Sequence, residues 1–225
     1  IHALSRSAVD PSLRKVSAGQ IDILDEDSIA AAAARIAEAG APDLVIIASG
    51  ILSDGTDLKP EKSLRQQDPA AFERVFAINT IGPALVAKHF IPLMPRSGRA
   101  VFAALSARVG SISDNRIGGW HAYRASKAAL NMLIKNYAIE QARRNPDFIA
   151  ACLHPGTVDT GLSKPFQSGV PDKQLFSAAQ SATYLLEVID KLTPAQSRKA
   201  LDRHSIEKHA ALSVVTNLVA VHCDV

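Results

Sequence analysis

A tyrosine and a lysine four residues apart, Tyr123 and Lys127, are the most informative chemical pair in this sequence of 225 residues. On a helix, side chains at this spacing lie on the same face, one turn apart. A tyrosine with a pKa of about 10 is a poor acid or base at neutral pH, but a neighbouring ammonium stabilises the phenolate and lowers that pKa. The pair could therefore act as a general acid–base unit, although two solvent-facing residues at a helix start would have the same spacing.

Other polar residues follow apolar runs on both sides of this pair. The run 100–105 ends at Ser106, and Pro155 and Gly156 come shortly after the run 148–153. An asparagine, Asn79, lies inside a segment predicted as a helix. These residues give the tyrosine–lysine pair a context that its spacing alone does not provide.

The elements that must position these residues alternate between strands and helices. The apolar runs are continuous, which is typical of parallel strands buried on both faces; they cover residues 1–4, 20–24, 44–48, 100–105 and 148–153. Capping residues, prolines and glycines bound the predicted helices, which run from 25–28 to Gly40, from Asp68-Pro69 towards Met94 with a disturbance at Gly82-Pro83, from about 123 to 144 and from about 177 to 192. This alternation predicts a parallel sheet with right-handed crossovers.

With these motifs in place, the sequence resembles the short-chain dehydrogenase/reductase (SDR) family. The string Ser-Ala-Arg-Val-Gly-Ser-Ile-Ser-Asp-Asn over 106–115 and Gly-Gly-Trp-His-Ala-Tyr-Arg-Ala-Ser-Lys-Ala-Ala-Leu over 118–130 look like C-factor-like proteins and sniffer-type carbonyl reductases. The resemblance implies an α/β, Rossmann-type doubly wound parallel sheet. It extends from Ile1 to about Ser197, so we expect one domain over 1–197 and an atypical C-terminal segment over 198–225.

The resemblance also implies catalytic roles for four residues. Tyr123 would be the general acid in carbonyl reduction or the base in alcohol oxidation. Lys127 would lower the pKa of Tyr123 and bind the nicotinamide ribose, and Ser106 would hold the substrate oxygen. Asn79 would interrupt its helix and help to hold a water that links Lys127 to solvent; as an alternative, it is an amide on the helix surface. Two further serines, Ser111 and Ser113, compete with Ser106 for its role.

A nicotinamide cofactor follows from the same resemblance, and its expected contacts are Ser5, Arg6, Asp22, Ile23, Ala48, Gly50, Tyr123, Lys127, Pro155, Gly156, Val158 and Thr160. Arg6 follows the first apolar run, where an arginine accommodates the 2′-phosphate of NADP(H) and an acid would select NAD(H). We therefore expect NADP(H) in preference to NAD(H), which stays possible if Arg6 is only a surface charge. Asp22 matches the aspartate that binds the adenine amino group, or is an exposed acid in a turn.

The substrate contacts are less defined in the sequence. The stretch 161–171 is punctuated by Gly, Ser and Pro and predicts a mobile lid, in which Leu162 and Phe166 could close over a ligand. Trp120 and His121 precede Tyr123 and either line the pocket or are structural.

The sequence departs from the family at both ends. Residues 1–4 match the second strand of the family, so we expect the N-terminal strand and its Gly-rich phosphate-binding loop to be missing from this sequence, either because it is truncated or because it is rearranged. An alternative is that residues 214–221 form a strand that fills the open position. That strand would not restore a phosphate loop, because no glycine occurs after Gly169.

Composition excludes several classes of protein. A hydrophobic fraction of 47% is incompatible with overall disorder, and a net charge of +3 without a basic block argues against nucleic-acid binding. No run of about 18 apolar residues predicts a membrane span. Two cysteines, Cys152 and Cys223, favour a cytoplasmic setting. The pair His204 and His209 does not have the spacing of a zinc helix, so we expect no metal site.

Two functions remain open. The first is hydride transfer between NADP(H) and a small carbonyl or alcohol substrate, by a chain that forms a homodimer or homotetramer, as the resemblance implies. The second is a non-catalytic binding or signalling protein with the SDR fold, which the absent Gly-rich loop favours.

Overall fold

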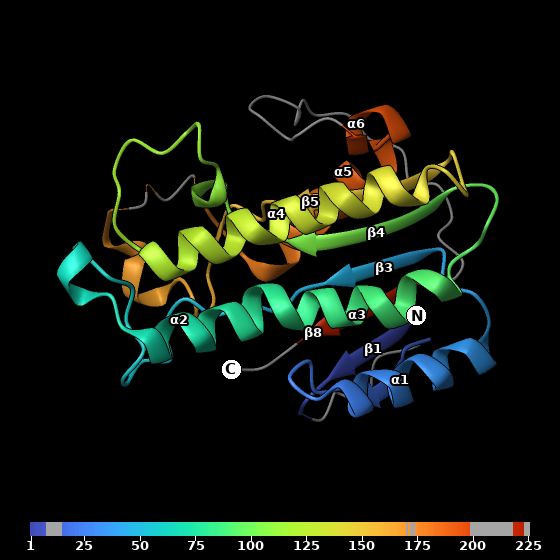
Figure 1. Cartoon of the computed structure of the whole chain (residues 1–225), viewed down its shortest axis with the longest axis horizontal. Helices are drawn as coiled ribbons and strands as arrows, with labels where there is room; N and C mark the ends of the chain where they lie inside the picture. Colours follow the sequence, from blue (N-terminus) through green and yellow to red (C-terminus); the bar gives the residue numbers. More distant parts are fainter. Residues whose placement is uncertain (8–14, 170, 172–173, 199–217, 223–225) are drawn as a thin grey trace.

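A six-stranded, wholly parallel sheet forms the centre of the computed structural model, which describes residues 1–7, 15–169, 171, 174–198 and 218–222. The strand order is β2-β1-β8-β3-β4-β5 (Figure 1). The bounds are β1 His2–Ser5, β2 Ser17–Gln20, β3 Leu44–Ile47, β4 Ala100–Leu105, β5 Phe148–Leu153 and β8 Leu218–His222. A short second sheet pairs β6 (Thr157–Val158) with β7 (Leu175–Phe176).

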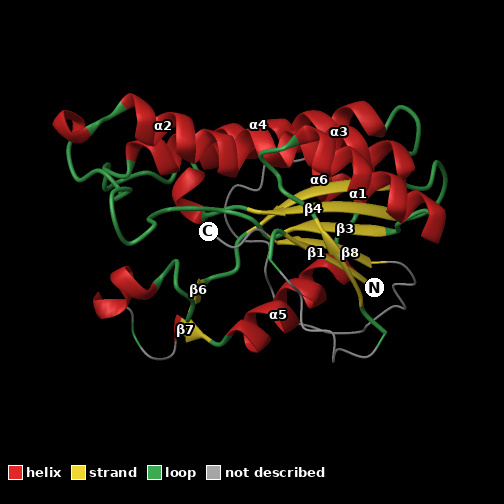
Figure 2. Cartoon of the chain, turned by 90° about the horizontal axis from the view of Figure 1, so that it is seen from below, coloured by secondary structure: helices red, strands yellow, loops and turns green. Residues whose placement is uncertain are grey.

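Helices cover both faces of the large sheet, as Figure 2 shows. One face carries α1 (Glu26–Ala39), α2 (Pro69–Phe76), α3 (Gly82–Phe90) and α4 (His121–Gln141), and the other carries α5 (Ala178–Lys191). The core correspondingly has two clusters of buried apolar side chains, one on each face. The short elements are α6 (Pro194–Arg198), η1 (Leu64–Gln66), η2 (Ala77–Ile81), η3 (Ile91–Leu93), η4 (Arg108–Gly110) and η5 (Lys164–Gly169). The prediction of an α/β doubly wound parallel sheet is confirmed.

Strong apolar runs became strands where the sequence predicted them. The predicted strands 100–105 and 148–153 match β4 and β5 residue for residue, and the run 44–48 contains β3. The predicted strand 20–24 is wrong, because β2 is Ser17–Gln20. Beyond Gln20 the backbone turns: the Ser28 hydroxyl accepts from the Asp22 N–H (2.9 Å), and the Asp22 carboxylate accepts from the Leu24 N–H (2.9 Å).

Helix starts follow the capping residues named from the sequence. Asp25 caps α1, Asp68 caps α2 ahead of Pro69, and Ser177 caps α5. A side-chain oxygen of each residue accepts a backbone N–H of the first turn, which satisfies a donor that a helix leaves unpaired. The longest helix, α4, lacks such a cap, because Trp120 at its N-cap position makes no side-chain capping bond.

The central position of the sheet is occupied by β8, which lies between β1 and β3 and pairs in parallel with both. Val219 and Val221 of β8 are 0% exposed, so this strand completes the core between its neighbours. The late segment thus fills the central position of the sheet, as the alternative proposed. The described part of that alternative is 218–221, and its residues 214–217 lie outside the described residues.

The stretch Pro69–Leu93 runs through α2, η2, α3 and η3 as one helical segment. By length and composition alone it could cross a membrane, but half of its most apolar window is buried inside the protein. It packs between α1 and α4 over the sheet (Figure 1), as a core helix does.

Candidate active site

The carboxyl ends of β3, β4 and β5 lie at one edge of the sheet because the strands are parallel. Figure 1 shows the arrowheads of β3 and β4 pointing towards the end of the molecule where α4 begins. Segments far apart in the sequence, at 48–50, at 106 and at 154–156, therefore follow strands at this edge, and the first two contact α4 at Lys127 and Asn131. Ligands of open α/β sheets bind in the crevice at this edge, where the strand order reverses. Here that point lies between β8 and β3.

Lys127 is buried at this edge with its ammonium group held by the sheet. Its side chain is 3% exposed, and its Nζ donates to the carbonyl oxygen of Leu105 at the end of β4 (2.9 Å). The same Nζ lies 5.9 Å from the centre of the Tyr123 ring. Gly50 approaches so closely that a Cβ there would stand 3.3 Å from the Lys127 Nζ and 3.4 Å from the Asn79 Oδ1. The structure thus brings Tyr123, Lys127, Asn79 and Gly50 together.

Asn79 lies in η2, a single π-helical turn between α2 and α3, so the prediction that it interrupts its helix is confirmed. The residue is 0% exposed, which excludes the surface amide. Its Oδ1 accepts from the Ile51 N–H (2.7 Å), and its Nδ2 donates to the Ile51 carbonyl (2.9 Å) and the Ser126 Oγ (3.1 Å). Asn79 therefore fastens the loop after β3 to α4.

Burial controls the proton affinities of Tyr123 and Lys127. It raises the pKa of the Tyr123 phenol from 10.0 to about 12 and lowers the pKa of Lys127 from 10.5 to about 8. The nearby Cys152 thiol opposes the lowering at Lys127. The expected fall in the Tyr123 pKa is thus wrong for this structure, because the cost of burying a phenolate outweighs the lysine. Tyr123 is therefore protonated at neutral pH, the state a general acid needs.

Ser106 lies where the sequence placed it, directly after β4, but its hydroxyl faces α4. The Ser106 Oγ donates to the Asn131 Oδ1 (2.7 Å), one turn of α4 beyond Lys127. A hydroxyl has one hydrogen, so in this arrangement Ser106 can only accept from a further group. The competing serines, Ser111 and Ser113, lie in the following loop with their hydroxyl oxygens 3.3 Å apart.

The end of β3 carries a buried group suited to a ligand. The Ser49 hydroxyl is buried and has no hydrogen-bond partner among the described residues. A buried polar group without a partner costs about 1–3 kcal/mol, which a polar ligand could recover. Ala48, beside it, donates its N–H to the Val221 carbonyl of β8 (2.7 Å). The unpaired Ser49 hydroxyl thus lies next to Gly50, which closely approaches Lys127.

Residues 155–160 form a turn and the short strand β6. Gly156 has a φ of +77°, and a Cβ there would lie 2.8 Å from the Phe176 ring, so only glycine fits. The Pro155 carbonyl accepts from the Ser181 Oγ (2.8 Å), and the Val158 carbonyl accepts from the Ser163 hydroxyl. Thr160 follows β6 and its Oγ1 donates to the Val158 carbonyl (3.4 Å).

The predicted lid contains η5, and its aromatic residue lies against the start of α4. The Phe166 ring centre is 5.2 Å from that of Trp120, which in turn is 6.4 Å from that of Tyr123. Trp120 and Phe166 therefore link the predicted lid to Tyr123. Residue 170 of the predicted lid lies outside the described residues.

The residues expected to bind the adenosine half of a cofactor lie around β1 and β2. Ser5 ends β1 and is 5% exposed, and Arg6 follows it and is exposed. Asp22 is in the loop after β2 and not on a strand; one oxygen of its carboxylate holds the turn at Leu24. Ile23 is 0% exposed, and its carbonyl oxygen would lie only 2.9 Å from a Cβ at Gly82.

Four polar residues of the site did not follow from sequence reasoning. Ser126 donates to the Tyr123 carbonyl (2.8 Å), and Thr80 donates to the Ser126 carbonyl (2.9 Å). The other two are Asn131, the partner of Ser106, and Glu61, a carboxylate 5% exposed. Ser126 and Asn131 could have been predicted from their positions beside Lys127 and one helical turn after it. Thr80 and Glu61 have no such local signal in the sequence.

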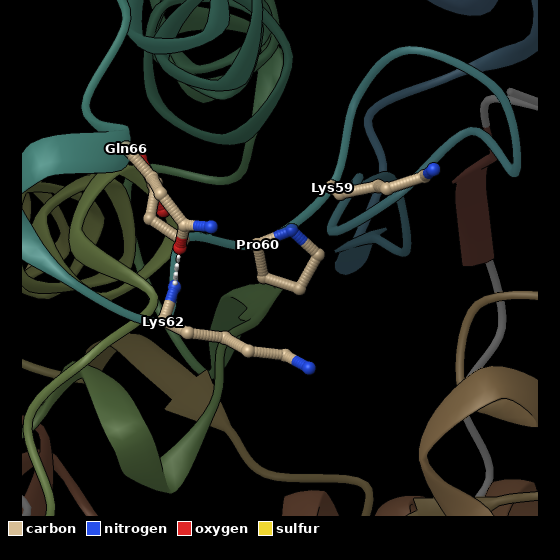
Figure 3. A pocket seen from close by; sticks show the side chains of 5 residues that line it. Lys59, Pro60, Lys62 and Gln66 are labelled. Atoms are coloured by element: carbon tan, nitrogen blue, oxygen red, sulfur yellow. Dashed lines mark hydrogen bonds between the residues drawn. The ribbon is translucent and has the colours of Figure 1, made fainter.

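A cavity of about 380 Å³ lies beside this edge and contains none of the residues expected to be catalytic; Lys59, Pro60, Glu61, Lys62 and Gln66 line it. Figure 3 shows the Gln66 side chain accepting the Lys62 N–H (2.7 Å) at its wall. Within the described residues, no group of three or more His, Cys, Asp or Glu side chains could hold a metal ion. The pair His204 and His209 lies outside those residues.

Comparison with known proteins places this geometry among oxidoreductases. A family model described as enoyl-(acyl carrier protein) reductase matches residues 4–191. The C-signal protein of Myxococcus xanthus is 35% identical over 145 residues, which are 64% of this chain and 82% of that protein. A Rhodococcus protein named 1-hydroxy-2-glutathionyl-2-methyl-3-butene dehydrogenase is 33% identical over 178 residues, which are 79% and 73% of the two chains.

Solved structures share the fold. The NADPH-bound carbonyl reductase from chicken fatty liver superposes with a TM-score of 0.71 at 24% identity, covering 88% of this chain and 82% of that one. A short-chain dehydrogenase/reductase from Burkholderia multivorans with bound NADP gives a TM-score of 0.64 at 26% identity, covering 83% and 72%.

Proposed function

The chain belongs to the short-chain dehydrogenase/reductase family, whose members are NAD(P)-dependent oxidoreductases, and from this premise we propose that it transfers hydride between NADP(H) and a small carbonyl or alcohol substrate. The observation that carries the proposal is the buried constellation of Tyr123, Lys127, Asn79 and Gly50 at the carboxyl edge of the sheet. A buried, protonated phenol beside a buried ammonium is costly for a fold and suited to proton transfer.

The residues present fit the cofactor at the end of β3. The unpaired Ser49 hydroxyl and the backbone of Gly50 would face it, Lys127 would hold its ribose, and residues 155–160 would hold its carboxamide. Arg6, at the carboxyl end of β1, favours a 2′-phosphate. The Burkholderia relative with bound NADP supports the same choice. When bound, the reduced nicotinamide supplies the hydride.

Tyr123 supplies the proton in the direction of reduction. Its O–H bond breaks as a new O–H bond forms on the carbonyl oxygen of the substrate, and the phenolate keeps the electron pair. The Lys127 ammonium stabilises that phenolate by its charge, at a ring distance of 5.9 Å. Asn79 accepts from the Ile51 N–H after β3, and Ser126 donates to the Tyr123 carbonyl, so both hold backbone next to the pair. Ser106 would bind the substrate oxygen once its hydroxyl turns from Asn131.

A non-catalytic role is the second candidate. It is favoured by the similarity to a protein named C-signal. The two candidates differ in cofactor binding and turnover.

Titration with NADPH and NADH, followed by nicotinamide fluorescence, separates them. We expect saturable binding of NADPH that is at least about tenfold tighter than binding of NADH, because a 2′-phosphate paired with an arginine is worth about 1.4 kcal/mol or more. If neither dinucleotide binds to the protein, hydride transfer is excluded and the binding or signalling role stands.

Tyr123→Phe tests the proposed acid. The variant keeps the ring and its packing on Trp120 but lacks the proton, so we expect turnover of a carbonyl substrate panel to fall by about 10³-fold or more while NADPH affinity stays within about threefold. Tyr184→Phe, on the exposed side of α5, is the matched control. Turnover by Tyr123→Phe at the wild-type rate would refute the role of Tyr123.

A further inference from the structure

The helix that carries the catalytic pair begins without a local cap. Trp120 occupies the N-cap position of α4, has no side-chain oxygen, and adopts a left-handed backbone with φ +51°. A non-glycine residue in this region costs about 1–2 kcal/mol. Tyr123 is in the first turn of this helix, three residues after Trp120. Something outside the helix must therefore hold the backbone there.

Glu61, from the loop between β3 and α2, supplies what Trp120 lacks. Its two carboxylate oxygens lie 3.2 and 3.4 Å from the Ala122 N–H, which donates to them. Its backbone carbonyl accepts from the Trp120 N–H at 2.5 Å. Glu61 thus accepts from two N–H groups that the helix itself leaves unpaired, those of Trp120 and Ala122. Its negative charge lies at the positive end of the helix dipole.

The loop holds Glu61 firmly in this place. Glu61 is 5% exposed although it is charged, and residues of its type are rarely buried without partners. The Gln66 side chain ties the loop by accepting from the N–H groups of Lys62 (2.7 Å) and Ser63 (3.3 Å), as part of the wall seen in Figure 3. On the other side, a Cβ at Gly119 would lie 3.3 Å from the Glu61 carbonyl oxygen.

We propose that Glu61 is a positioning residue for catalysis, a cap donated from a distant loop that fixes the first turn of α4 and hence the phenol of Tyr123. Ala122, which its carboxylate binds, directly precedes Tyr123. The Trp120 backbone that it holds also carries the ring that packs between Tyr123 and Phe166 of the lid. Loss of the carboxylate would loosen the helix start at Ala122, beside Tyr123, while the Glu61 backbone carbonyl would still accept the Trp120 N–H. The proposal rests on the proposed oxidoreductase function.

Three variants test the proposal by steady-state kinetics on the full chain. Glu61→Ala removes the carboxylate that accepts the Ala122 N–H, so we expect kcat to fall by about tenfold or more. The Kd for NADPH should change by less than about threefold, because Ser49 and Gly50, which would face the cofactor, are untouched. Glu61→Gln retains an oxygen that accepts the Ala122 N–H, so we expect kcat within about threefold of wild type. Glu38→Ala, on the exposed face of α1, is the matched control.

Hydrogen exchange supplies a readout that does not depend on activity. We expect Glu61→Ala to speed exchange in peptides covering 120–125 while those of α1 are unchanged, and Glu61→Gln to restore protection. Faster exchange without measurable wild-type turnover would refute the oxidoreductase function and leave the cap in place. Wild-type kcat and exchange in Glu61→Ala, or a Glu61→Gln as impaired as Glu61→Ala, would overturn the proposal.

Discussion

Burial, more than charge pairing, determines the chemistry of the individual residues in this site. Tyr123 and Lys127 move in opposite directions, because loss of water disfavours the phenolate of one and the ammonium of the other. Both shifts favour the neutral forms. At pH 7 the tyrosine is therefore protonated and neutral, whereas most of the lysine is still charged because its pKa of about 8 lies above 7. In the reduction that we propose, the pair thus starts in the state that donates a proton to a carbonyl oxygen.

The lysine makes stability depend on pH. Because the pKa of Lys127 is about 8 in the folded protein and 10.5 in an exposed lysine, the unfolded chain binds more protons above pH 8. The free energy of unfolding should therefore rise with pH from about 7.5 to 9. Above that window Cys152 also contributes, because burial raises the pKa of its thiol from 9.0 to about 12. Denaturant unfolding at several pH values measures this rise.

Lys127→Met is the variant for that experiment. It removes a buried charge, so we expect it to be more stable than wild type at pH 7 by up to about 3 kcal/mol, to lose the rise with pH, and to lose turnover. Lys135→Met, two turns further along the same helix, is the control. A Lys127→Met protein with the same pH dependence as wild type would show that another group titrates.

At the scale of elements, β8 is the least expected feature. Its Leu-Val-Ala-Val sequence has no local property that distinguishes a central strand from an edge strand or a buried helical turn. Its place follows from its neighbours, since β1 and β3 each offer a row of unpaired backbone groups that one parallel strand satisfies. β8 therefore contributes to the carboxyl edge of the sheet, where its Val221 carbonyl accepts from the Ala48 N–H.

Val219→Asp tests the position of β8. A carboxylate introduced at a side chain that is 0% exposed should lower the free energy of unfolding by at least about 3 kcal/mol or prevent folding. Ile112→Asp, at a side chain 86% exposed, should change it by less than about 0.5 kcal/mol. Thermal and denaturant unfolding measure both. Equal stability of Val219→Asp and wild type would mean that β8 does not fill the sheet.

For the whole molecule, the helical face of α4 and η2 leaves apolar side chains in water. Ile81 is 53% exposed, Met132 59% and Ile139 43%. Met132 and Ile139 are seven residues apart and so share one face of α4, next to the helical segment that carries Ile81. We propose that a second copy of this chain covers this face, in agreement with the homodimer or homotetramer that the family resemblance implies.

Sedimentation velocity tests the assembly. Wild type should sediment as a dimer or tetramer at micromolar concentration, and Met132→Glu combined with Ile139→Glu should sediment as a monomer, because two charges would be buried in the contact. Ile112→Glu should leave the assembly intact, because this exposed side chain belongs to the loop after η4 and not to α4 or η2. A monomeric wild type would contradict the proposal.

The sequence by itself determined the strands β4 and β5, the capped starts of α1, α2 and α5, and the spacing of Tyr123 and Lys127, because these depend on near neighbours in the chain. Only the tertiary structure decided the placement of β8, the turn of Ser106 towards Asn131, the cap that Glu61 lends to α4 and the direction of the Tyr123 pKa. Each of these depends on groups distant in sequence: a strand needs partners, a buried hydroxyl or carboxylate needs donors and acceptors, and desolvation depends on everything packed around a side chain.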